Sequence, residues 1–115
     1  MARRRAREFV LKAVYQADVS GGTVSVALEG LFAGLLDQNG TDKPAEADEV
    51  TFAVAIAAGI DARGGEIDGH IETASTNWRL VRMPAVDRSI LRLATAEMML
   101  MPDVPASVTI NEAVE

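Results

Sequence analysis

The sequence predicts an all-α protein, and three observations support this fold class. Apolar residues recur at intervals of three and four along most of the chain, which is the spacing of one helical face. Alanine, the strongest helix former, is abundant. No segment has a convincing strand pattern, because the partial alternation over 104–110 is short and contains Pro105. We therefore expect about six helices in one domain of 115 residues.

Glycines separate the first two predicted helices. The first helix covers residues 3–19, and Ser20-Gly21-Gly22 ends it. Its apolar stripe consists of Phe9, Val10, Ala13, Val14 and Ala17. The second helix begins near Thr23 or Ser25, since either residue can cap a helix N-terminus. A polar loop over 37–45 follows it.

The third predicted helix, over 47–62, is apolar almost all round, so we expect it to be the central one. Gly64-Gly65 breaks the pattern, and a fourth helix covers 66–78. Its inner face consists of Ile67, Ile71, Ala74 and Trp78. Although Arg79 and Arg82 follow Trp78, its place on this face favours a core role over an RNA contact.

Proline marks both ends of the fifth predicted helix. Met83-Pro84 begins it, since proline is favoured in a first turn, and Pro102 and Pro105 end it. A last helix begins near Ser107 or Thr109 and has no stop signal before the sequence ends. We therefore expect the natural chain to continue further.

Charge is distributed unevenly along the chain. The formal net charge is −6, yet residues 1–12 carry a net charge of +4 and residues 13–115 a net charge of −10. A second basic cluster, over 79–92, surrounds Asp87. The average charge therefore hides a basic N-terminus that can attract a polyanion.

The composition argues against several classes of function. There is no cysteine and only one histidine, so disulfides, thiolate metal sites and a Ser–His relay are not expected. No nucleophile motif or phosphate-binding glycine loop is present, so we expect no enzyme activity, cofactor or metal. No apolar stretch approaches the roughly 18 residues of a membrane span, and a cytoplasmic location fits.

The strongest functional signal is the arginine segment of the first helix. Arg3, Arg4, Arg5 and Arg7 lie where the helix macrodipole disfavours cations, and they repel one another. A polyanion would compensate for these costs, because arginine forks match phosphate geometry. A solvated, frayed terminus is the alternative. We favour nucleic acid as the ligand of this segment.

Tyr15 and Asp87 are further candidate contact residues. Tyr15 lies beside the apolar stripe of the first helix, where it either contacts a base or a partner, or is a half-buried aromatic. Asp87 lies in the first turn of the fifth helix, where a carboxylate is favoured, and can pair with Arg88 or Arg92. The residues alone leave these alternatives open.

Three segments together resemble the NusB family. The first is Ala2-Arg3-Arg4-Arg5-Ala6-Arg7-Glu8 followed by Ala13-Val14-Tyr15-Gln16. The second is Glu66-Ile67-Asp68 with Trp78 further on. The third and most specific is Val86-Asp87-Arg88-Ser89-Ile90-Leu91-Arg92-Leu93-Ala94, Glu97, Asp103-Val104-Pro105 and Ile110-Asn111-Glu112-Ala113-Val114-Glu115. The region 20–48 is similar only in character.

The resemblance implies an all-α fold of two small helical bundles, forming a single RNA-binding domain over 1–115. It implies a transcription antitermination factor that binds boxA-type single-stranded RNA of ribosomal operons. It also implies two protein partners: NusE, a small-subunit ribosomal protein, and RNA polymerase. Arg3, Arg4, Arg5 and Arg7 then match the family's RNA-contacting arginines, and Tyr15 and Asp87 match positions at or near NusE. The family continues past Asn-Glu-Ala by one further helical segment, which this sequence lacks.

Two other functions remain open. NusB-like domains also form the N-terminal part of some ribosomal-RNA cytosine methyltransferases, which would require a long catalytic domain after Glu115. The second is a helical module that forms a homodimer and has no RNA role. Salt distinguishes it, since RNA binding weakens steeply with salt and an apolar dimer does not.

Overall fold

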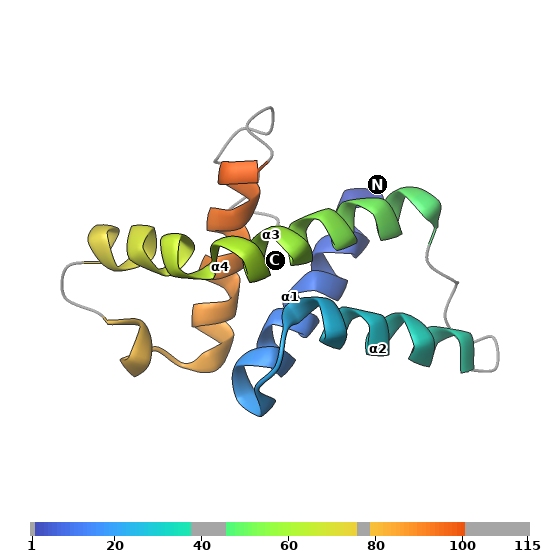
Figure 1. Ribbon diagram of the computed structural model, residues 1–115, viewed down its shortest axis with the longest axis horizontal. Helices are drawn as coiled ribbons and strands as arrows, with labels where there is room; N and C mark the ends of the chain where they lie inside the picture. The colour runs from blue at the N-terminus through green and yellow to red at the C-terminus, as the bar shows by residue number, and fades with distance from the viewer. Residues whose placement is uncertain (1, 38–45, 76–78, 101–115) are drawn as a thin grey trace.

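The computed structural model describes residues 2–37, 46–75 and 79–100. Over these residues it contains four α-helices, one 3-10 helix and no strand (Figure 1). The all-α prediction is therefore confirmed. The predicted last helix, the core role of Trp78 and residues 38–45 of the predicted polar loop lie outside the described residues.

Helix α1 covers Ala2–Ser20 and ends where the sequence predicts. Gly21 and Gly22 have φ values of 83° and 91°, a left-handed conformation that glycine adopts without steric cost. The Gly21 amide donates to the carbonyl oxygen of Ala17 at 2.9 Å and so closes the last turn. The predicted stripe is the packed face of the helix, since Phe9, Val10, Ala13 and Val14 are buried and Ala17 is half-buried.

Helix α2 covers Val24–Asp37, and two residues cap its N-terminus. The hydroxyl of Thr23 accepts a hydrogen bond from the amide of Val26 at 3.2 Å, so Thr23 is the capping residue. Asp61, from another helix, accepts hydrogen bonds from the amides of Val24 at 2.8 Å and Ser25 at 3.0 Å. The negative carboxylate lies at the positive end of the helix dipole, so this contact fixes α2 against its neighbour.

Helix α3 covers Ala47–Ala74 and is kinked. Glu46 and Glu49 form a reciprocal capping box at its start. Arg63 has non-helical angles, φ −122° and ψ 26°, so two helical segments meet there. The two helices predicted over 47–62 and 66–78 are therefore halves of one bent helix. The bend falls just before Gly64-Gly65, which continue the helix instead of breaking it.

The chain after α3 forms a short 3-10 helix and then α4. The 3-10 helix, η1, covers Leu80–Arg82, and α4 covers Ala85–Leu100. The carbonyl oxygen of Pro84 accepts the hydrogen bond of the Arg88 amide at 3.0 Å. Pro84 therefore marks the start of this helix, as its missing amide proton predicts.

The helices form two groups that share α1 and α3. In Figure 1, α1, α2 and the first half of α3 lie together, and η1 and α4 lie against the second half of α3. Both α1 and α3 pack on each other and on α2 and α4. The predicted central helix, α3, therefore shares that position with α1, and one face of α3 stays open, with Val54 exposed. Within the described ranges, no helix is long and apolar enough to cross a bilayer.

Candidate functional site

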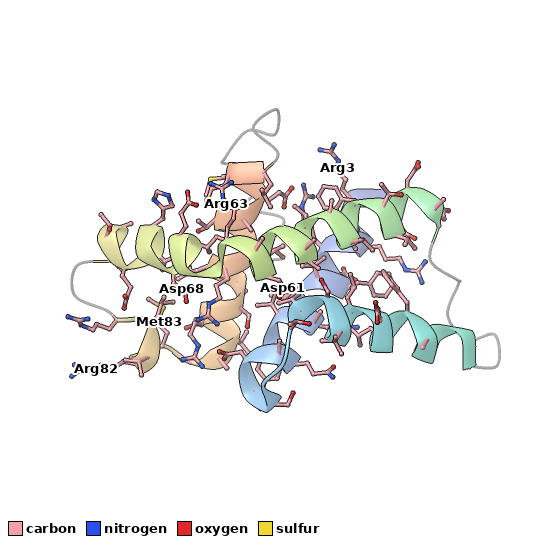
Figure 2. The ribbon with its side chains drawn as sticks, viewed as in Figure 1. Arg3, Asp61, Arg63, Asp68, Arg82 and Met83 are labelled. Atoms are coloured by element: carbon pink, nitrogen blue, oxygen red, sulfur yellow. The ribbon has the colours of Figure 1, made fainter. Side chains whose placement is uncertain are left out.

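The arginines at the start of α1 differ in their exposure to solvent. Arg3 and Arg4 are exposed, Arg5 is half-buried and Arg7 is buried. Figure 2 shows Arg3 beside the first half of α3, whereas Arg82 lies at the opposite end of the molecule. Two exposed arginine side chains and one half-buried one thus form a basic surface at one end of α1.

Phe52 of α3 supports this basic surface. Its buried ring lies 5.2 Å from the guanidinium carbon of Arg3 and 5.7 Å from that of Arg7, measured to the ring centroid. Both distances fall within the range of cation–π attraction. Because Arg3 and Arg7 are one helical turn apart, a single ring can contact both and orient the exposed Arg3.

Arg5 is held by a carboxylate and a second aromatic ring. Its guanidinium lies 3.5 Å from the carboxylate of Glu49 and 5.2 Å from the centroid of the Phe9 ring. Glu49 is buried and also accepts the amide hydrogen bond of Glu46 at 2.9 Å, within the capping box of α3. The start of α3 therefore helps to fix the start of α1.

Arg7 does not have the environment expected of an RNA-contacting residue. Its Nε lies 2.9 Å and 2.8 Å from the two carboxylate oxygens of Glu97, and its Nη2 also donates to that carboxylate. The side chains are 4% and 0% exposed, respectively. The structure therefore places Arg7 in a buried ion pair, unlike Arg3 and Arg4, and its contact with RNA stays a prediction. Its fork is already used by a buried partner on α4.

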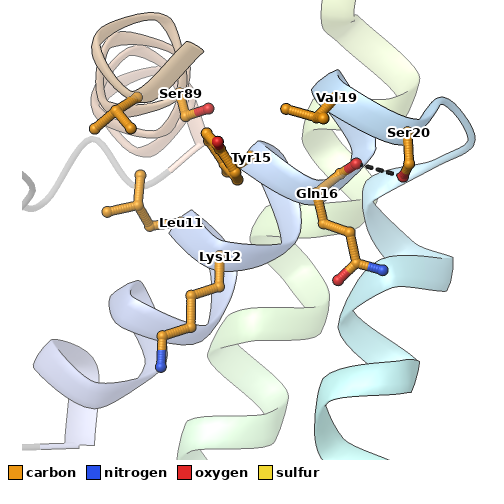
Figure 3. Close-up of a pocket in the computed structure, with 8 residues that line it drawn as sticks. Leu11, Lys12, Tyr15, Gln16, Val19, Ser20 and Ser89 are labelled. Atoms are coloured by element: carbon orange, nitrogen blue, oxygen red, sulfur yellow. Dashed lines mark hydrogen bonds between the residues drawn. The ribbon is translucent and has the colours of Figure 1, made fainter.

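Tyr15 lines an apolar groove between α1 and the start of α4. The groove has a volume of about 470 Å³, and Leu11, Tyr15 and Val19 of α1 line it, with Ser89 opposite (Figure 3). Val86 of α4 also lines the groove. Tyr15 is 42% exposed, Val19 62% and Val86 53%. Three exposed apolar side chains at one groove are unusual on a surface without a partner, so this is a candidate protein-binding site.

Asp87 lies at the same end of α4 as this groove. It belongs to the first turn of the helix, is half-buried, and adjoins Val86, which lines the groove. The structure therefore brings the neighbourhoods of Tyr15 and Asp87 together. It keeps them apart from the exposed arginines, which lie three to four helical turns away along α1.

Arg88 and Arg92, the two possible partners of Asp87, form ion pairs with other carboxylates. Arg88 and Arg92 bind Asp18 of α1 at 2.6 Å and 3.0 Å, and Arg92 also binds Asp68 of α3 at 2.8 Å. Arg88 further donates to the carbonyl oxygens of Leu80 and Met83. Two of the four arginines in the second basic cluster therefore hold helices together and are unavailable to a polyanion.

The same network shifts the pKa values of its members. Burial alone would raise the pKa of Asp18, but hydrogen bonds and charges from Arg88 and Arg92 outweigh it and lower that pKa below its usual value. Asp68, followed by Asp18, raises the pKa of Arg92 despite partial burial. Both groups therefore stay charged near neutral pH. No cluster of three or more potential metal ligands occurs within 2–37, 46–75 and 79–100.

A model of the NusB family matches residues 4–115. This chain belongs to the NusB family. The match covers almost the whole sequence, including the arginines of α1 from Arg4 onward, the apolar groove and the residues after α4.

Relatives and a solved structure agree with this assignment. The "Transcription antitermination protein NusB" of Myxococcus xanthus (strain DK1622) is 42% identical, over 99% of this chain and 79% of the relative. The protein of the same name from Anaeromyxobacter sp. (strain Fw109-5) is also 42% identical, over 100% of this chain and 75% of the relative. The structure of T. maritima NusB is 32% identical and has a TM-score of 0.82, covering 97% of this chain and 73% of that chain.

Membership of the NusB family confirms the family resemblance and the fold that it implied. Transcription antitermination, the role in the relatives' names, is not an enzymatic role, and this NusB-family chain is accordingly a non-enzymatic protein.

Several residues that build these surfaces were not among those predicted from the sequence. Val19 could have been predicted, because Leu11, Tyr15 and Val19 follow one another at intervals of four, on one helical face. Phe52 and Glu97 could not have been predicted, because their partners on α1 lie far away in sequence. The burial of Arg7 could also have been predicted. Arg7 precedes Val10 by three residues and Val14 by seven, so it lies on the same helical face as the apolar stripe.

Proposed function

We propose that this chain is a transcription antitermination factor that binds boxA-type RNA of ribosomal operons together with NusE, and that the complex acts on RNA polymerase. The observation that carries the proposal is the pair of surfaces on α1, one basic and one apolar, in a member of the NusB family. The proposed site of action is the cytoplasm. Residues 1–115 act as one RNA-binding domain.

The basic surface is the proposed RNA contact. Arg3 and Arg4 present exposed guanidinium groups, and Arg5 presents a partly exposed one. Such groups bind phosphates and release counterions, which gives affinity that falls with salt. Phosphate contacts alone carry no sequence information, so preference for boxA also requires contacts to unstacked bases.

The apolar groove is the proposed site for NusE. Tyr15, Val19 and Val86 offer exposed apolar area of the kind that anchors a protein partner. Asp87 at its edge provides a negative charge, which suits the basic surface of a ribosomal protein. The separation of the groove from the arginines along α1 supports simultaneous binding of RNA and NusE.

Fluorescence anisotropy tests the proposal. Labelled boxA-type RNA and a scrambled RNA of the same length are titrated with the protein, with and without NusE, across a salt series. We expect tighter binding to the boxA-type RNA, a further gain with NusE, and a steep loss with salt. Equal, weak binding to both RNAs with no effect of NusE would exclude this function.

A second copy of the chain is the alternative occupant of the groove. In that case sedimentation velocity would detect a dimer that persists at high salt, because apolar contacts are not screened. Tyr15→Ala would dissociate such a dimer. A monomer at all salt concentrations excludes the homodimer and leaves the groove to a different protein.

A further inference from the structure

The contact between Arg7 and Glu97 joins the second turn of α1 to the fourth turn of α4, across 90 residues of sequence. Both carboxylate oxygens of Glu97 accept hydrogen bonds from the guanidinium, in a forked arrangement. Neither side chain is appreciably exposed, and Glu97 is completely enclosed. The pair is the only buried link between charged side chains of α1 and α4 among the residues that the structure describes.

The position of Arg7 on α1 determines where the exposed arginines point. Residues four apart lie on one helical face, so the direction of Arg7 fixes that of Arg3 one turn earlier. Both guanidinium groups lie against the same Phe52 ring. With Arg7 held by Glu97, α1 cannot rotate about its axis here without breaking a buried ion pair, so the helical first turn presents Arg3 in a fixed direction.

A phosphate is a poor competitor for Arg7. To bind it, Arg7 would have to leave Glu97, whose carboxylate would then remain buried without its partner. Arg3 and Arg4 are exposed, and binding a phosphate would not require either of them to leave a buried carboxylate. The RNA therefore gains more by using the exposed groups and leaving the buried pair intact.

We infer that Arg7 and Glu97 are positioning residues for RNA binding, and that Arg7 itself does not contact the RNA. The inference rests on the proposed function. It assigns a role to Glu97, which has no access to any ligand, and it divides the arginine segment into a contacting part, Arg3 and Arg4, and a supporting part, Arg7.

Glu97→Gln separates the two possible roles of Arg7, because they predict opposite results. If Arg7 positions the helix, weakening the pair lowers affinity for boxA-type RNA by about tenfold, the effect of a residue of moderate importance at an interface. The salt slope of binding stays at the wild-type value, since no phosphate contact is lost. If Arg7 were itself a contact, its release from Glu97 would raise affinity, because binding would no longer require the buried pair to break.

Two matched variants control this measurement. Arg4→Gln removes an exposed arginine of the basic surface and should reduce the salt slope by about 0.7, the value for one phosphate contact with a single strand. Glu66→Gln removes an exposed ion pair with Arg63 and should change neither affinity nor slope. Unchanged affinity in Glu97→Gln, with normal behaviour of the controls, would overturn the inference and leave the proposed function standing. Failure of the wild-type chain to prefer boxA-type RNA would remove both.

A measurement on the wild-type chain covers the case in which Glu97→Gln does not fold. Phenylglyoxal modifies accessible arginines, and mass spectrometry locates the modified residues with and without boxA-type RNA. We expect Arg3 and Arg4 to react and to be protected by RNA, and Arg7 to be unreactive in both states. Reaction of Arg7 in the free protein, whether or not RNA protects it, would overturn the inference.

Discussion

Three different environments surround the four arginines of α1. Arg3 and Arg4 are exposed, Arg5 lies between Glu49 and the Phe9 ring, and Arg7 is enclosed with Glu97. A buried guanidinium is stable only because its partner neutralises it and satisfies its hydrogen-bond donors. The same residue type therefore serves ligand binding at one position and folding at another, a few residues further along the helix.

The two roles predict different effects of alanine on stability. Arg7→Ala leaves Glu97 buried and unpaired, so we expect a loss of about 3 to 5 kcal/mol in the free energy of unfolding. Arg4→Ala should change it by less than about 0.5 kcal/mol, since its side chain is exposed. Urea denaturation followed by circular dichroism measures both. Equal stability of the two variants would show that Arg7 is not held as described.

Asp87 and Tyr15 make a second prediction about single residues. Asp87→Lys reverses the charge at the edge of the groove and should weaken NusE binding by about tenfold or more, while RNA binding by the isolated chain changes little. Tyr15→Ala should weaken NusE binding as well, because the exposed ring loses its apolar contact area. Isothermal titration calorimetry measures the affinity of each variant for NusE, and fluorescence anisotropy measures the affinity of Asp87→Lys for RNA. If Asp87→Lys lowers both affinities together, Asp87 has a structural role.

At the level of secondary-structure elements, helix ends depend on local chemistry. Gly21 and Gly22 end α1 in a left-handed conformation, Thr23 caps α2, and Pro84 begins α4. Each signal acts within a few residues, so each could be predicted from sequence. The bend of α3 could not be predicted in this way. Gly64 and Gly65 retain helical geometry, and the non-helical backbone angles occur at Arg63.

Glycine to alanine substitutions should therefore have opposite effects at two positions. Gly21→Ala places a side chain at φ 83° and should destabilise the fold by about 1 kcal/mol. Gly65→Ala lies in a helix with open space around the new Cβ and should stabilise it by about 0.5 to 1 kcal/mol. Thermal unfolding of the two variants measures both signs. A loss of stability in Gly65→Ala would mean that the bend requires glycine.

The arrangement of the elements shows where prediction from sequence ends. The apolar stripe of α1 and the order of the helices follow from periodicity, which is a local property. The ion pairs do not: Arg7 meets Glu97 and Asp18 meets Arg88 only because α1 and α4 cross, and no local pattern encodes that crossing. For the same reason, the sequence reveals the arginine segment at the start of α1 but not the buried pairing of Arg7 with Glu97.

For the whole molecule, the network around Asp18 connects three helices. Arg88 and Arg92 of α4 bind Asp18 of α1, and Arg92 also binds Asp68 of α3. Asp18 is only 13% exposed, so its charge is partly shielded from solvent. Because both helical groups contribute to this network, its charge state affects the fold as a whole.

The lowered pKa of Asp18 predicts how stability depends on pH. A carboxylate whose pKa is lower in the folded state stabilises the fold above its ordinary value of 3.8, and this contribution is lost as the pH falls through the lower, folded value. Asp18→Asn should lose roughly 2 kcal/mol at pH 7, and its difference from the wild type should shrink toward pH 3. Urea denaturation across this range measures the difference.

The control for this prediction is Glu29→Gln on α2, whose exposed side chain carries the same charge. It should keep the wild-type free energy of unfolding at pH 7 to within about 0.5 kcal/mol. A difference between Asp18→Asn and the wild type that stays constant from pH 7 to pH 3 would contradict the role of the ionised carboxylate.

The buried pair of Arg7 and Glu97 also restricts how the sequence can change through descent. Loss of either member alone leaves a charge enclosed without its counterpart, so a lineage that replaces one must replace the other at nearly the same time. Arg4, in solvent, is under no such constraint. Across the family, the positions of Arg7 and Glu97 should therefore vary together, either retained as a pair or exchanged for two uncharged residues, while the position of Arg4 varies independently of both.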